Sequence, residues 1–290
     1  MPFAQEAADA ALGSILVPEL PALRTPHPEV ERILAEVPDF LGVPFVSPIF
    51  QALAHYPDHL TALWLPTRGL LTRPGFGEQV RAVLAGLPAP DAAGIDWADV
   101  GDIPAITGYT ETFAWPLPKL LTLVTIWYGA VLGEPEASSA PSFPEGAPLG
   151  VHPGARNLPI PTEPPTPDLA SVFAEIRAEH ELPRVLSYYR ALGHWPEFLP
   201  AAWERLRPIA TGDMYASIRN SALRTAEQLA ADFPLRIPAM PGDADVRAIL
   251  AIFRSRMIPA LLLDTALIKG LLVDREAMAT SAIHPDGTCA

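Results

Sequence analysis

Asp264 is the side chain whose type and surroundings most strongly suggest chemistry. It lies in IPALLLDTALIKGLLV, a segment that is otherwise apolar on every side of the predicted helix. An isolated buried charge costs several kcal/mol, so this carboxylate must be paired, protonated or functional. Two interpretations stay open. The first is structural: an ion pair with Arg256, Lys269 or Lys119, or a snorkelling contact at the helix surface. The second is a pocket carboxylate with a perturbed pKa that acts as a catalytic base.

A second group of candidates combines two arginines with aromatic side chains. Arg254 and Arg256 lie in the segment FRSR, just before the same predicted helix, and a guanidinium can hold a substrate carboxylate through two hydrogen bonds. The two arginines can also be ordinary ion-pair residues. Trp115, Tyr188 and Tyr189 are candidates for the wall of a pocket, with Tyr188 as a catalytic hydrogen-bond donor.

The sequence gives no support for a metal ion or an organic cofactor. It contains no nucleotide-binding GxGxxG or GxxxxGK[ST], no HExxH and no GxSxG, and its single cysteine is Cys289. His55 and His194 recur in the two halves of the chain, and we expect them to cap helix C-terminal carbonyls rather than to bind a metal. We therefore expect neither a metal site nor a cofactor.

The elements that must position these residues occur twice. Segment 28–72 aligns with segment 167–211 at a constant offset of 139, most clearly where FQALAHYPDHLTALW matches YRALGHWPEFLPAAW. Further on, the offset becomes 141, and PKLLTLVTIWYGAVL matches PALLLDTALIKGLLV. Such a run of matches indicates an internal duplication. The copies differ in chemistry where Phe45 corresponds to Arg184 and Ile49 to Tyr188.

Each copy is predicted to be helical, so the fold class is all-α. Apolar residues in 28–36 and 167–176 follow helical spacing, and signals for strands are almost absent. Segments 118–132 and 259–273 are apolar nearly all round, which predicts two central helices.

We expect residues 1–133 to form the first helical repeat and residues 167–290 the second, joined by a proline-rich linker over 134–166. Two copies that each expose an apolar face should pack about a pseudo-twofold axis, as one globular unit and a tied version of a dimer. The functional site is then expected where the copies meet.

Composition restricts the partners. The chain has 290 residues and a net charge of −13, from 20 Lys and Arg against 33 Asp and Glu. This charge repels phosphate backbones and anionic lipids, which argues against nucleic acid and membrane partners. The longest apolar run, Leu120 to Leu132, is shorter than the roughly 20 residues of a membrane span. We expect a cytoplasmic protein whose partner is a small organic molecule.

Several segments resemble the DehI family, the group I 2-haloacid dehalogenases. VPFVSPIFQALAHYP, LPRVLSYYRALGHWP, FAWPLPKLLTLVTIW and SFPEGAPLGVHPG carry the resemblance, which covers about residues 28–275. It implies an all-α pseudo-dimer, often a homodimer, with its site between the repeats and without metal or organic cofactor. In that family an aspartate activates water, which displaces halide from the α-carbon of a haloacid with inversion. The LAHYP region also resembles the wider AhpD-like helical superfamily, without its CxxC.

The family's site residues correspond only in part. Tyr188 stands at the position of the water-activating aspartate, and Leu117 at that of the water-positioning asparagine. A pocket tryptophan corresponds to Phe45, and the neighbouring serine is retained as Ser187. Tyrosine titrates near about 10 and leucine has no proton chemistry, so neither can act as a general base at neutral pH.

Two functions of different classes follow. The first is a cofactor-independent enzyme that acts on a small or medium organic substrate, for example a carboxylate, in an apolar pocket between the repeats. It would be a repurposed hydrolase, lyase or cyclase, with Asp264 as relocated base and Arg254 or Arg256 as anion anchor; ordinary dehalogenation is not expected. The alternative is a non-catalytic descendant of the fold that binds an apolar ligand or a protein.

Overall fold

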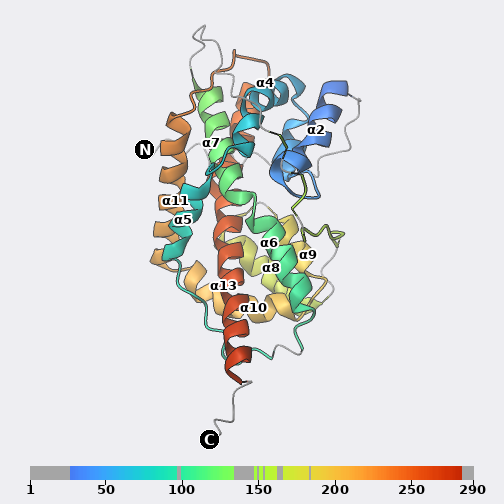
Figure 1. Cartoon of the computed structure of the whole chain (residues 1–290), viewed down its shortest axis with the longest axis vertical. Coiled ribbons are helices and arrows are strands. Elements are labelled where there is room, and N and C mark those ends of the chain that lie inside the picture. The colour runs from blue at the N-terminus through green and yellow to red at the C-terminus, as the bar shows by residue number, and fades with distance from the viewer. Residues whose placement is uncertain are drawn as a thin grey trace, which may run out of the picture.

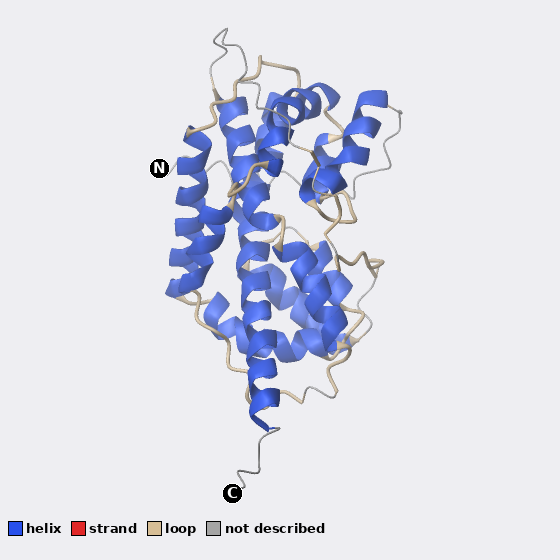
Figure 2. Ribbon diagram, viewed as in Figure 1, coloured by secondary structure: helices blue, strands red, loops and turns tan. Residues whose placement is uncertain are grey.

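The structure is a computed structural model that describes residues 27–96, 99–133, 147–148, 150–152, 154–161, 166–182 and 184–282, with side chains as far as Val273. Figure 2 shows helices joined by loops, and the described residues contain no strand. The predicted all-α fold class is therefore confirmed.

The described helices fall into two series, one in each half of the chain. The first half contains α2 (Pro28–Leu41), α3 (Pro48–Leu53), α4 (Pro57–Thr67), the 3₁₀ turn η1 (Arg68–Thr72), α5 (Glu78–Val83), the 3₁₀ turn η2 (Leu84–Gly86), α6 (Ile103–Ala114) and α7 (Leu117–Leu132). The second half contains α8 (Pro167–Glu179), α9 (Ser187–Leu192), α10 (Phe198–Ala210), α11 (Asp213–Ala231), α12 (Asp243–Ile252), the π turn η3 (Phe253–Met257) and α13 (Ile258–Ala282).

Prolines set the beginnings of several helices. α2, α3, α4 and α8 each begin with a proline, where its missing N–H leaves no helical hydrogen bond unmade. Pro57 opens α4 as the sequence predicts, whereas α10 begins at Phe198, two residues after Pro196. α2 ends at Leu41, and the C-cap residue Gly42 has a φ of 75°, in the left-handed region that glycine adopts without strain.

One contact is repeated between the halves. The indole N–H of Trp64 donates to the Glu36 carboxylate at 2.5 Å, and Arg68 pairs with the same carboxylate at 2.9 Å. The second half repeats the contact with Trp203, Glu175 and Arg207. The constant offset of these residues supports the duplication, and it shows why Trp64 and Trp203 recur. The pseudo-twofold axis itself remains a prediction.

The two halves pack through their apolar helices. α7 of the first half contacts α11 and α12 of the second, and α6 contacts α13. Figure 1 shows α13 running through the middle of the molecule, with α11 on one side and α6, α8 and α9 on the other. The core of buried apolar side chains is continuous from Val30 in α2 to Leu272 in α13. The halves therefore share a core, and any site between them is held by helices of both.

One helical stretch, Ile103–Leu132, is long and apolar enough to cross a membrane by length and composition. Within the protein, 78% of its apolar window is buried, which is also what a central core helix shows. This stretch is weak evidence for a membrane span.

Candidate functional site

A cavity of about 310 Å³ lies between the two halves and is the candidate site; we call it the inter-repeat cavity. Its wall comes from the residues around the starts of α3 and α9, from the junction of α6 with α7, from η3 and the start of α13, and from the linker. Several lining residues occupy matching positions of the two copies: Phe45 with Arg184, Gln51 with Arg190, and Leu117 with Ile258. The cavity lies where the two copies meet, and its role as the functional site stays a prediction.

Arg184 and Arg190 give the inter-repeat cavity its charge. Both come from the second half, whereas the matching positions of the first half hold Phe45 and Gln51. Arg190 is fixed by a hydrogen bond from its guanidinium to the carbonyl of Pro161 at 2.8 Å. The described lining residues include these two arginines and no Asp, Glu or His.

Aromatic side chains form much of the apolar wall. Phe45 and Phe113 are stacked with ring centroids 4.9 Å apart, and Tyr109 lies 5.1 Å from Phe113. Such offset and tilted ring pairs contribute stabilisation beyond the burial of their area. Burial raises the pKa of Tyr109, so its hydroxyl stays protonated and can donate a hydrogen bond.

The linker closes one side of the inter-repeat cavity. Asn157, Leu158 and Ile160 contribute to the lining. The segment is held by Arg190 at Pro161 and by the imidazole of His194, which donates to the carbonyl of Pro159 at 2.7 Å. His194 thus binds the linker instead of capping its own helix, which corrects the predicted capping role.

Tyr188, the proposed catalytic donor, is fully buried behind two lining side chains. Its ring stacks on Tyr109 at 5.9 Å and contacts Phe113 at 5.1 Å. Its hydroxyl lies 3.1 Å from the hydroxyl of Thr110. Burial raises the pKa of Tyr188 well above its ordinary value. Tyr188 is a neutral core residue here, and it is not among the residues that line the cavity.

Asp264 is also absent from the lining, although it is completely buried. Its Oδ2 lies 2.9 Å from Nε2 of His180 and accepts a hydrogen bond from Tyr189 at 2.9 Å. Its Oδ1 accepts one from Tyr215 at 2.7 Å. We call these four side chains the Asp264 cluster. None of the cations expected as ion-pair partners is involved; His180 takes their place.

The Asp264 cluster exists only in the second copy. At the aligned positions the first copy holds Leu41, Phe50 and Leu123, all buried and apolar, in place of His180, Tyr189 and Asp264. Burial by itself would lower the pKa of His180, but the charge and hydrogen bond of Asp264 raise it above the ordinary value. The buried carboxylate is therefore fully paired.

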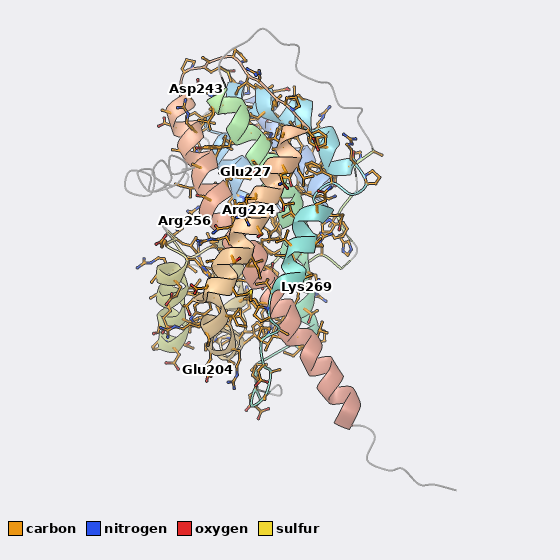
Figure 3. The ribbon with its side chains drawn as sticks, turned by 90° about the vertical axis from the view of Figure 1, so that its left-hand side faces the viewer. Glu204, Arg224, Glu227, Asp243, Arg256 and Lys269 are labelled. Atoms are coloured by element: carbon orange, nitrogen blue, oxygen red, sulfur yellow. The ribbon has the colours of Figure 1, made fainter. Side chains whose placement is uncertain are left out.

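Arg254 and Arg256 are engaged away from the inter-repeat cavity. Arg254 pairs with Glu227 of α11 and lies over the ring of Tyr128, and Arg256 pairs with Glu181. Figure 3 labels Glu227 and Arg256, which belong to α11 and η3. Neither arginine lines the cavity, so the structure does not place them as its anion anchors.

Of the remaining predicted binding residues, three line the inter-repeat cavity and two lie elsewhere. Phe45, Leu117 and Ser187 line the inter-repeat cavity. Tyr189 belongs to the Asp264 cluster, and Trp115 lines a different cavity, where its ring lies 5.1 Å from the ring of His152.

Sequence reasoning missed Arg184, Arg190, Tyr109 and Asn157 as lining residues. The change from Phe45 to Arg184 between the copies was a usable signal, because it adds a charge to one copy only. Among the described residues, no group of three or more His, Cys, Asp or Glu side chains is placed to hold a metal ion.

No protein-family model matches this chain. An (R)-2-haloacid dehalogenase of Rhizobium sp. (strain NHG3) is 27% identical over 206 residues, which are 66% of this chain and 78% of that protein. The chain is similar to 2-haloacid dehalogenases. This finding supports the resemblance to the DehI family.

Solved structures agree on the fold. A D-2-haloacid dehalogenase in complex with L-LA superposes with a TM-score of 0.67 at 20% identity, covering 85% of this chain and 93% of that one. A D-2-haloacid dehalogenase mutant gives 0.66 at 19% identity with the same coverage. At this identity the likeness establishes the dehalogenase fold alone.

Proposed function

We propose that the inter-repeat cavity binds a small organic carboxylate, with the anion at Arg184 and Arg190 and the apolar part against the aromatic wall. The observation that carries the proposal is the lining itself: two arginines and several neutral donors, with no described acidic side chain and no described histidine. Guanidinium groups bind carboxylates through paired, charge-assisted hydrogen bonds.

The described lining of the inter-repeat cavity holds no side chain that can activate a water molecule as a general base at neutral pH. A general base must lie within hydrogen-bond reach of the water and titrate near the working pH. Tyr188 is buried with a raised pKa, Leu117 has no proton to exchange, and Asp264 is enclosed by its own donors. We infer that the fold has kept a carboxylate pocket and lost the base that the dehalogenase reaction requires.

The test compares binding with turnover. Purified protein is titrated with lactate and 2-chloropropionate by calorimetry, and halide release from both enantiomers of 2-chloropropionate is followed in parallel. We expect saturable binding without halide release. Arg184→Gln should weaken binding about tenfold or more, because one charge-assisted pair is lost. Arg207→Gln is the control, since Arg207 is half exposed and pairs with Glu175 outside the cavity.

A dehalogenase-like hydrolase is the second candidate, and the similarity to the (R)-2-haloacid dehalogenase favours it. In that case halide or another leaving group must be released by water held at the cavity. Turnover that is lost in Arg184→Gln but retained in Asp264→Asn would establish this candidate and overturn the binding-only function.

A further inference from the structure

One wall of the inter-repeat cavity is held on both sides by the Asp264 cluster. We call this wall, which comes from the second half of the chain, the second-copy wall; it consists of Arg184, Val185, Leu186 and Ser187. His180 is the C-cap residue of α8 and precedes the wall, and Tyr189 follows it in α9. Both side chains bind the same atom, Oδ2 of Asp264, at 2.9 Å. One buried oxygen therefore fixes the chain before and after the second-copy wall.

The turn that leads into the second-copy wall is strained. Glu181, which follows His180, has a φ of 51° and is the only non-glycine residue with a positive φ among the described residues. The aligned residue of the first copy is Gly42, with a φ of 75°. The left-handed conformation costs free energy for a residue with a Cβ, so it persists only where the surroundings hold it. Here the neighbours do so, because His180 is bound by Asp264 and the Glu181 carboxylate pairs with Arg256.

The strength with which Asp264 holds His180 depends on the proton of the imidazole. Burial and the charge of Arg219 oppose protonation, whereas Asp264 and Glu179 favour it, and the pKa of His180 is raised. The other side chains against the imidazole are the rings of Trp203 and Tyr215, with centroids at 6.0 and 5.7 Å. An imidazolium binds a carboxylate more strongly than a neutral imidazole does, because both groups are then charged. The contact therefore weakens as the pH rises through the pKa of His180.

We propose that His180 and Asp264 are positioning residues for the inter-repeat cavity: they hold the second-copy wall in the conformation that binds the ligand, and they hold it best when His180 is protonated. The first copy has no equivalent, since the aligned residues are Leu41 and Leu123. This inference rests on the proposed function of the cavity and adds the residues that shape it and a dependence of binding on pH.

The first experiment measures the affinity for lactate by calorimetry at pH 6 and at pH 8. The carboxylate of lactate and the arginines of the cavity keep their charges over this range, so they do not themselves change the affinity. We expect the unchanged protein to bind lactate at least about threefold more weakly at pH 8, because the charged contact of His180 is lost. Equal affinity at the two pH values would overturn the proposal and leave the proposed function intact. Absence of binding at both would overturn the proposed function as well.

Asp264→Asn separates His180 from other groups that titrate in this range, such as His194 at the linker. The amide has the size of the carboxylate and keeps an acceptor, but it carries no charge, so burial should leave His180 neutral. We expect this variant to bind lactate at pH 6 about as weakly as the unchanged protein does at pH 8, with no further fall at pH 8. A fall equal to that of the unchanged protein would assign the pH dependence to another group and overturn the role of His180.

The second experiment separates positioning from stability. The triple variant His180→Leu/Tyr189→Phe/Asp264→Leu installs the aligned residues of the first copy. We expect it to bind lactate about tenfold more weakly while it still folds by circular dichroism, because the second-copy wall is no longer held by Asp264. Thr67→Val is the control: the buried Thr67 hydroxyl accepts a hydrogen bond from Trp127 at 3.0 Å within the first half, so this change should lower stability and leave lactate affinity unchanged.

Unchanged lactate affinity in the folded triple variant, or an equal loss of affinity in Thr67→Val, would overturn the positioning role. If the triple variant does not fold, the comparison of Asp264→Asn with the unchanged protein at the two pH values decides the question.

Discussion

At the scale of single residues, Asp264 explains how a charge lies in an otherwise apolar helix. Its carboxylate is reached by donors from three places: His180 at the end of α8, Tyr189 in α9 and Tyr215 in α11. A buried charge that is paired in this way adds little net stability, but removing one partner leaves the others desolvated and unsatisfied. The cluster is therefore a set of interdependent residues, and its members should not behave additively.

The first prediction follows from that interdependence. Asp264→Leu should lower the free energy of unfolding by about 3–5 kcal/mol, because it leaves His180 and two tyrosine hydroxyls without their acceptor. Adding His180→Leu and Tyr189→Phe should recover at least half of the loss, since these changes install the residues of the first copy. Tyr215 keeps the carbonyl of Ala260 at 3.4 Å as an acceptor. Urea unfolding measures each variant. Additive losses would show that the four side chains are not coupled.

The pH dependence of stability belongs to the same residues. The pKa of His180 is raised in the folded protein. At a pH between the pKa of the unfolded chain and that of the folded protein, His180 is therefore more fully protonated in the folded state than in the unfolded state. The stabilisation is complete below the unfolded pKa of about 6.5 and is lost as pH rises through the folded pKa. We expect the free energy of unfolding to fall between pH 6 and pH 8 more steeply in the unchanged protein than in His180→Leu/Asp264→Leu. Urea unfolding at pH 6 and at pH 8 gives the free energy of unfolding of both proteins. An equal fall between the two pH values in the unchanged protein and in the double variant would contradict this prediction.

At the scale of helices, the sequence was informative wherever local chemistry decides the outcome. The repeat at a constant offset, the prolines at helix starts and the apolar central segments predicted the elements, because each depends on residues close in the chain. The partners of Asp264 could not be predicted, since they depend on how α8, α9 and α11 approach α13. The same holds for Arg190, whose position is set by a hydrogen bond to the linker.

The hydrogen bond between His194 and the linker can be tested by substitution. His194 holds the linker through the carbonyl of Pro159, whereas the aligned His55 makes no such bond among the described residues. One hydrogen bond contributes about 1 kcal/mol, so His194→Ala should weaken binding of a cavity ligand about fivefold by loosening the segment that lines it. His55→Ala is the matched control and should leave binding unchanged. Calorimetry with lactate compares the two variants, and equal effects of the two substitutions on binding would show that the contact between His194 and the linker does not affect the cavity.

At the scale of the whole molecule, the halves are bound together by more than the linker. α7 contacts α11 and α12, α6 contacts α13, and the buried core is continuous across both halves. Separating the halves would expose α7, of which nearly every residue is buried. Such an apolar surface, once exposed, favours association or unfolding over a stable separate domain.

We therefore expect neither half to fold by itself. A fragment of residues 27–133 should show no cooperative urea transition, and mixing it with a fragment of residues 147–282 should restore one, because the shared core is the main source of stability. As a control, a protease site inserted between residues 133 and 147 should allow cleavage of the intact protein without separating the halves on gel filtration. A cooperative transition of the first fragment alone, with its own slope in urea, would show that the halves are independent domains and that the cavity between them is not held by a common core.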